Sequence, residues 1–197
     1  MPLYLPPGAT KVPPGRIKVG ATTYYALPGV VPIGNTGTGA LVANRLQYMP
    51  IILAEPVTLT DIAFEVTAGV ASSLVRCGIY TADTDWVPTS LVSGTDAAEY
   101  DCSTNGEKGT SGLSIVLAAG RYYLSILSNV NPPTVRLIRG VLPGLLFQSA
   151  WSANVYTANL FASQTYGALP STPPALGTLS GANAPSFDYR VLIKYTP

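Results

Sequence analysis

Apolar and polar residues alternate along many short stretches of this chain, and this period of two limits the possible folds more than any other property of the sequence. The clearest stretch is FDYRVLIKY at 187–195, and VTLTDIAFEVTA at 57–68 places Ile62, Phe64 and Val66 on one face. Such alternation is typical of strands with one buried face. Further stretches of this kind lie at 45–53, 73–81, 113–118, 121–128, 134–141 and, less clearly, 152–163.

Turn-forming residues separate these stretches, and no segment shows a helical period over ten or more residues. Roughly eight strands in about 150 residues predict an all-β fold, an antiparallel β-sandwich of jelly-roll type over residues 45–197. Ala118-Ala119-Gly120 predicts a hairpin or a tight sheet corner between two of the strands. The Pro-, Ser- and Gly-rich loop 167–185 is expected to lie outside the sandwich.

Residues 1–44 form a different kind of segment, because seven prolines and seven glycines interrupt them. Proline fixes φ and lacks a backbone donor, so this density predicts an extended N-terminal arm without helix. We expect the arm to dock on a neighbouring subunit; the alternative is a tail ordered only by chance contacts. The candidate docking residues are Tyr4, Lys11, Arg16, Lys18, Tyr24 and Tyr25.

The charge content predicts that part of the surface is covered by other protein. Charged residues make up 11% of the chain, against about 25% in an ordinary soluble protein, and apolar residues make up 47%. The net charge of +1 provides no basic face for nucleic acid or anionic lipid, so we expect neither as a partner. No apolar run approaches the ~20 residues that span a bilayer, and prolines interrupt the N-terminus where a signal peptide has its apolar region.

Catalytic equipment is sparse, and we expect a protein that is not an enzyme and has no cofactor. The chain has no histidine, which removes the commonest general base and metal ligand. Asp83 and Asp85 are a weak Ca²⁺ candidate, but they lack the spacing of an EF-hand and more simply turn the chain between strands. Cys77 and Cys102 are expected to be buried free thiols, with a disulfide as the alternative.

Aromatic residues near strand ends are the remaining candidates for a binding site. Trp86, Trp151 and Tyr156 are possible contacts for a glycan or a protein partner, because apolar sugar faces stack on aromatic rings. The alternative, which the apolar composition favours, is that these rings pack at the rim of the core or in a subunit interface.

Residues 50–129 resemble a jelly-roll module of tailed-bacteriophage virion proteins. The residues that carry the resemblance are the strand entry Pro56–Leu59, the strand end Gly78-Ile79-Tyr80, Pro88 followed by Leu91-Val92, and the glycine turn and strand Gly120–Leu124. The resemblance implies a homotrimer on the exterior of a phage particle, assembled in the host cytoplasm and bound to capsid or tail proteins.

Two functions follow from this resemblance. The first is a structural protein, a capsid decoration or cement protein or a head fibre, whose N-terminal arm docks on the particle. The second is a tail fibre or receptor-binding protein that recognises host-surface polysaccharide through Trp86, Trp151 or the loop 167–185. The short chain and the arm favour the first.

Overall fold

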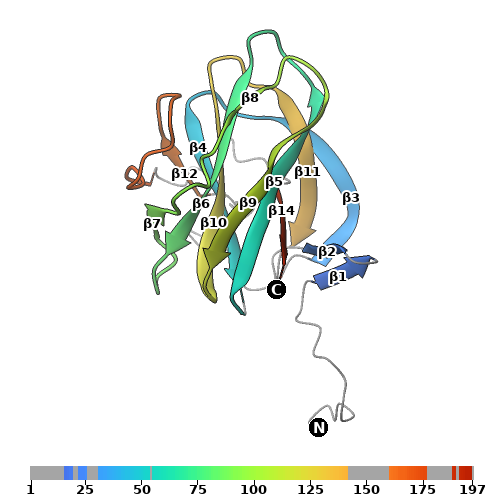
Figure 1. The fold of residues 1–197 in the computed structure, drawn as a ribbon. Coiled ribbons are helices and arrows are strands. Elements are labelled where there is room, and N and C mark those ends of the chain that lie inside the picture. Colours follow the sequence, from blue (N-terminus) through green and yellow to red (C-terminus); the bar gives the residue numbers. More distant parts are fainter. Residues whose placement is uncertain are drawn as a thin grey trace, which may run out of the picture.

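Two antiparallel sheets pack face to face in the computed structural model, which describes residues 16–19, 22–25, 31–53, 55–141, 160–176, 188–189 and 191–196 (Figure 1). Every element in these residues is a strand, which confirms the all-β prediction. Sheet A contains β1 (Arg16–Val19), β2 (Thr22–Tyr25), β3 (Val31–Ala40), β5 (Val57–Ala68), β9 (Gly106–Leu117), β11 (Thr134–Val141), β13 (Asp188–Tyr189) and β14 (Val191–Thr196). Sheet B contains β4 (Arg45–Leu53), β6 (Leu74–Ala82), β7 (Pro88–Leu91), β8 (Glu99–Asp101), β10 (Gly120–Ser128) and β12 (Leu160–Ser163).

Eight of these strands form four nested antiparallel pairs, which is the arrangement of a jelly roll. The outermost pair is β3 with β11, followed by β4 with β10, β5 with β9 and β6 with β8. Pairing of β11 with β5, and of β10 with β6, joins these pairs into the two sheets. The chain therefore passes back and forth between the sheets, as the sequence predicted.

β3 lies within residues 1–44, which we had assigned to the arm. It pairs with β11 from Ala40, opposite Thr134, to Val31, opposite Val141. Among the described strands β11 is its only neighbour, and an edge position tolerates Pro32 because the missing donor can face away from the sheet. Residues 31–40 are therefore a sandwich strand, and the boundary lies earlier than residue 45. β1 and β2 pair with each other, and β2 adjoins β14.

The connection 118–120 is a sheet corner, one of the two alternatives predicted for it. β9 ends in sheet A and β10 begins in sheet B, where its partners are β4 and β6. β9 begins at Gly106, seven residues before the predicted strand 113–118, because pairing with β5 holds a segment rich in glycine and polar residues in the sheet.

The main core lies between the sheets. Side chains from β4, β5, β6, β10 and β11 are buried there, among them Met49, Leu59, Phe64, Ile79, Leu124 and Leu137. Ile62, Phe64 and Val66 share the inward face of β5, as their alternation predicted. Cys77 and Cys102 are buried in this core as free thiols, in agreement with the sequence analysis. No helix in the described part of the chain is long and apolar enough to cross a membrane.

Candidate functional site

A second apolar layer covers the outer face of sheet B, on the side away from the main core. Tyr48 of β4, Tyr80 of β6 and Tyr123 of β10 are fully buried in it. The ring of Tyr48 packs edge to face against both neighbours, with centroids 5.5 Å from Tyr80 and 5.9 Å from Tyr123. The central strands of sheet B are therefore buried on both faces. Leu46, Leu127, Ala162 and Leu169 complete the layer, which we call the tyrosine layer.

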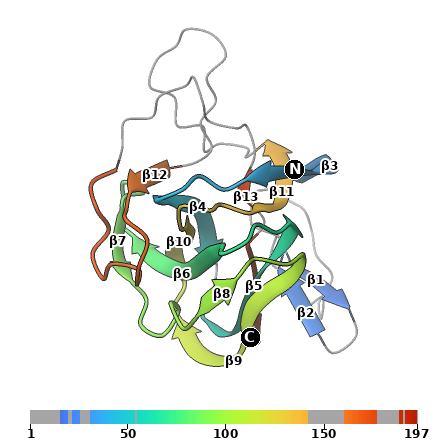
Figure 2. The same cartoon turned by 90° about the horizontal axis from the view of Figure 1, so that it is seen from above.

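Residues 160–176, here called the strap, lie over this layer at the β7–β12 side of sheet B (Figure 2). The strap begins as β12, which pairs with β4 from Tyr48 to Arg45. The side chain of Leu169 then fills the space above Gly78, where an added Cβ would lie only 2.6 Å from its Cδ1 atom. The hydroxyl of Tyr80 donates to the Pro170 carbonyl at 2.8 Å, and the Leu91 amide donates to the Ser171 carbonyl at 2.9 Å. The first half of the loop 167–185 is thus packed on the sandwich, and residues 177–185 lie outside the described residues.

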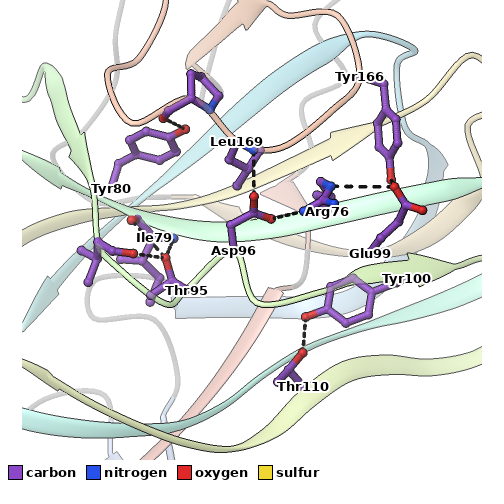
Figure 3. Close-up of polar contacts among 12 residues, drawn as sticks. Arg76, Ile79, Tyr80, Thr95, Asp96, Glu99, Tyr100, Thr110, Tyr166 and Leu169 are labelled. Carbon is purple, nitrogen blue, oxygen red and sulfur yellow. Dashed lines mark hydrogen bonds and ion pairs between the residues drawn. The ribbon is translucent and has the colours of Figure 1, made fainter.

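Two carboxylates fasten the strap to the end of β6 (Figure 3). Asp96 accepts hydrogen bonds from Arg76 Nη1 at 3.0 Å and from the Leu169 amide at 2.8 Å. Glu99 accepts from the Tyr166 hydroxyl at 2.9 Å and lies 3.8 Å from Arg76 Nε. Arg76 and Asp96 are largely buried, and hydrogen bonds to charged groups are worth about 1.5–3 kcal/mol each. Because these carboxylates are engaged in positioning the strap, they are not a free acid–base pair.

Tyr80 and Tyr123 are neutral hydrogen-bond donors. Burial raises the pKa of Tyr80 above its ordinary value, and the nearby charge of Asp96 raises it further. Burial likewise raises the pKa of Tyr123, and Asp83 acts in the same direction. The hydroxyl groups stay protonated because their charged forms would be desolvated. Their role in this layer is to pack and to donate, as Tyr80 does to the strap.

Trp86 closes one end of the tyrosine layer. Its ring packs edge to face against Tyr123 at 6.2 Å, and the guanidinium of Arg121 lies 5.2 Å from the ring centroid. The residue has a φ of 61°, an uncommon conformation for a large side chain. The buried Tyr123 hydroxyl donates to the Trp86 carbonyl at 2.6 Å and so helps to hold this conformation. The half-buried ring therefore has a packing role at the rim of the layer, whatever else it contacts.

Asp83 stabilises the turn that contains Trp86. Its Oδ1 atom accepts from the amides of Asp85 and Val87 at 2.9 and 2.8 Å. This is the turn-forming alternative that the sequence analysis named for the Asp83/Asp85 pair. Within the described ranges no group of three or more His, Cys, Asp or Glu residues could hold a metal ion.

The other predicted site residues lie either in β1 and β2 or outside the described residues. Tyr4, Lys11, Trp151 and Tyr156 lie outside the described residues. Arg16 and Lys18 are in β1, and Tyr24 and Tyr25 are in β2, where the backbone alone is described. In the backbone register, Arg16 is opposite Tyr25 and Lys18 is opposite Thr23.

The sequence analysis missed the tyrosine layer and its strap. A signal for it was present in β10, GRYYLSILS, where every residue from Tyr122 to Ser128 is buried. An apolar run without clean alternation indicates a strand that is covered on both faces. The strap that covers this face could not be predicted from the sequence of sheet B alone, because Leu169 of the strap lies far along the chain from Gly78.

Comparisons with protein-family models, with curated proteins and with solved structures give no match to this chain.

Proposed function

We propose that this chain is a non-enzymatic structural protein on the exterior of a bacteriophage virion, a capsid decoration or cement protein or a head fibre. The observation that carries the proposal is where the residues of the resemblance lie. Pro56–Leu59 leads into β5, Gly78-Ile79-Tyr80 is in β6, and Gly120–Leu124 begins β10. β6 and β10 are paired in sheet B and β5 lies in sheet A, so these residues lie on strands of both sheets of the jelly roll, which supports a resemblance in architecture.

Composition supports the same proposal. A chain with 11% charged residues and 47% apolar residues is better suited to an assembly than to life as a free monomer. The central strands of sheet B, β4, β6 and β10, are covered on both faces within the chain, and we propose that sheet A and the N-terminal residues contact capsid protein or other copies. The resemblance implies that those copies form a homotrimer.

The test is binding of the purified full-length chain to particles of the phage that encodes it, separated into emptied heads and tails. Saturable binding to heads is expected, with weaker binding for Tyr4→Ala and for Lys11→Glu. The matched control is Lys108→Glu, which makes the same charge change on β9. Equal loss of binding in the control, or no binding to either fraction, would contradict the proposal.

A tail fibre or receptor-binding protein is the second candidate, and Trp86 is the observation that favours it. Its ring is partly exposed in a strained turn beside exposed Asp85 and Val87, and strained residues cluster at ligand sites. Binding to tails and to host-surface polysaccharide instead of heads would support this candidate. Trp86→Ala should then weaken polysaccharide binding by at least ~1 kcal/mol, as is common for stacking rings in binding hot spots.

A further inference from the structure

The edge of β9 differs from the other sheet edges in the described part of the chain. Exposed edges invite pairing with another chain, and proteins blunt them with short strands, prolines, charges or bulges. β7, β8 and β12 have four, three and four residues, and β3 contains Pro32. β9 has twelve residues and no proline, and its only described neighbour is β5. It is therefore the least protected of these edges.

The two halves of β9 are protected to different degrees. The first half carries Glu107 and Lys108, and the Tyr100 hydroxyl of β8 reaches it through a hydrogen bond with Thr110 at 2.8 Å. A register shift against β5 follows, near Gly112, which has a φ of 75°. The shift covers residues 112–114, and from Leu113 to its end the strand runs Leu113-Ser114-Ile115-Val116-Leu117 with no charge, glycine or proline. These five residues are the unprotected part of the edge.

Exposure of apolar side chains points to the same part of the edge. Val116 is 73% exposed, the highest value among the exposed large hydrophobic residues of the described structure. Leu113 and Ile115 face the main core but are only partly buried against it. A strand added beside β9 would cover the exposed Val116 and the partly buried Leu113 and Ile115, since it would extend the outer face and the core face of the sheet together.

We propose that residues 113–117 of β9 pair antiparallel with the same residues of a second copy of this chain. A two-fold axis at Ile115 places Leu113 opposite Leu117 of the second copy and Ser114 opposite Val116 of the second copy. Every residue then meets a side chain on its own face, and the segment brings no like charges together. Such a contact joins the two A sheets into one continuous sheet.

The inference goes beyond the proposed function, and it differs in the number of copies from what the resemblance implies. A two-fold contact gives an even number of chains, whereas the resemblance implies three. It requires no virion, so it is tested separately from binding to phage heads.

The experiment measures the mass of the full-length chain in solution by light scattering and sedimentation over a range of concentrations. Wild type should reach twice the 20.5 kDa of one chain. Val116→Lys should raise the dissociation constant about tenfold or more, because a charge blunts the edge. The matched control is Val130→Lys, since Val130 is 68% exposed and lies outside β9, and this variant should stay dimeric.

A second variant tests the register. In Ser114→Glu/Val116→Lys, the introduced lysine of each copy would face the introduced glutamate of the other copy, so the double variant should regain the dimer; failure to regain it overturns the axis at Ile115. A wild-type mass of three chains overturns the two-fold contact while leaving self-association standing. A wild-type monomer overturns the contact as well. If Val116→Lys then melts at a lower temperature than wild type, another segment of the same chain covers the edge of β9. Equal loss of the dimer in Val116→Lys and Val130→Lys also contradicts the proposal.

Discussion

The contact between Gly78 and Leu169 offers a direct test of how the strap is held. An alanine Cβ at position 78 would lie 2.6 Å from Leu169 Cδ1 and 3.1 Å from Leu91 Cδ1, whereas carbon atoms in good contact are about 3.5–4.0 Å apart. Overpacking of this kind costs about 1–3 kcal/mol, from which about 0.5–1 kcal/mol is recovered because alanine suits a strand better than glycine. Gly78→Ala should therefore lower the free energy of unfolding by up to about 2.5 kcal/mol, with a central value near 1 kcal/mol.

The partner substitution acts through a cavity. Leu169 is 5% exposed, and truncation of a buried leucine to alanine costs about 2–5 kcal/mol. We expect a value near the lower limit, because a strap on the outside of a sheet can settle into the space. In the variant Gly78→Ala/Leu169→Ala the new methyl group no longer meets a leucine. The double variant should therefore be more stable than the sum of the single losses predicts, by about 1–2 kcal/mol.

Urea unfolding of wild type, the two single variants and the double variant, analysed by linear extrapolation, measures the coupling between positions 78 and 169. Gly167→Ala is the matched control, because an added Cβ there meets nothing within 4 Å, and it should be nearly neutral. Additive losses, or a Gly78→Ala variant as stable as Gly167→Ala, would refute the placement of Leu169 above Gly78.

Two further predictions concern buried polar groups. Tyr80→Phe should lower the free energy of unfolding by about 1 kcal/mol, because the hydrogen bond to the Pro170 carbonyl is lost. Tyr48→Phe should be neutral or stabilising, because the buried Tyr48 hydroxyl has no hydrogen-bond partner among the described residues. Urea unfolding of both variants measures the difference. Burial raises the pKa of Cys102 from 9.0 to about 12, so the unfolded chain loses this proton first, and the free energy of unfolding should fall as pH rises across that interval. The fall should be smaller in Cys102→Ala, and an equal fall in both proteins would exclude this thiol as a cause.

Strand positions were the most predictable part of the fold. The ranges 45–53, 57–68 and 134–141 coincide with β4, β5 and β11, because alternation over eight or more residues has one reading when one face is buried. Nearest-neighbour chemistry also predicted that Asp83 would turn the chain and that Ala118-Ala119-Gly120 would form a hairpin or a sheet corner. The choice of the corner depended on β4 and β6, the partners of β10 in the other sheet.

Distant pairing decided what local composition predicted wrongly. Val31–Ala40 contains one proline and three glycines, which locally favours an extended arm, yet pairing with β11 makes it a strand of sheet A. The segment 106–112 is equally poor in apolar residues and is held in β9 by β5. A ladder of backbone hydrogen bonds needs no particular side chain, so its formation depends on a partner that only the folded chain supplies.

For the candidate site, the residue types could be recognised in the sequence, whereas their roles depended on tertiary packing. The absence of histidine, the low charge and the many tyrosines of the chain were visible at once. Whether a tyrosine faces water, a ligand or a packed layer depends on what lies over it. In this protein a strap far beyond β10 in the sequence covers Tyr80 and Tyr123, and Trp86 closes the rim, because aromatic area on the outer face of a sheet is stabilised when another part of the chain removes it from water.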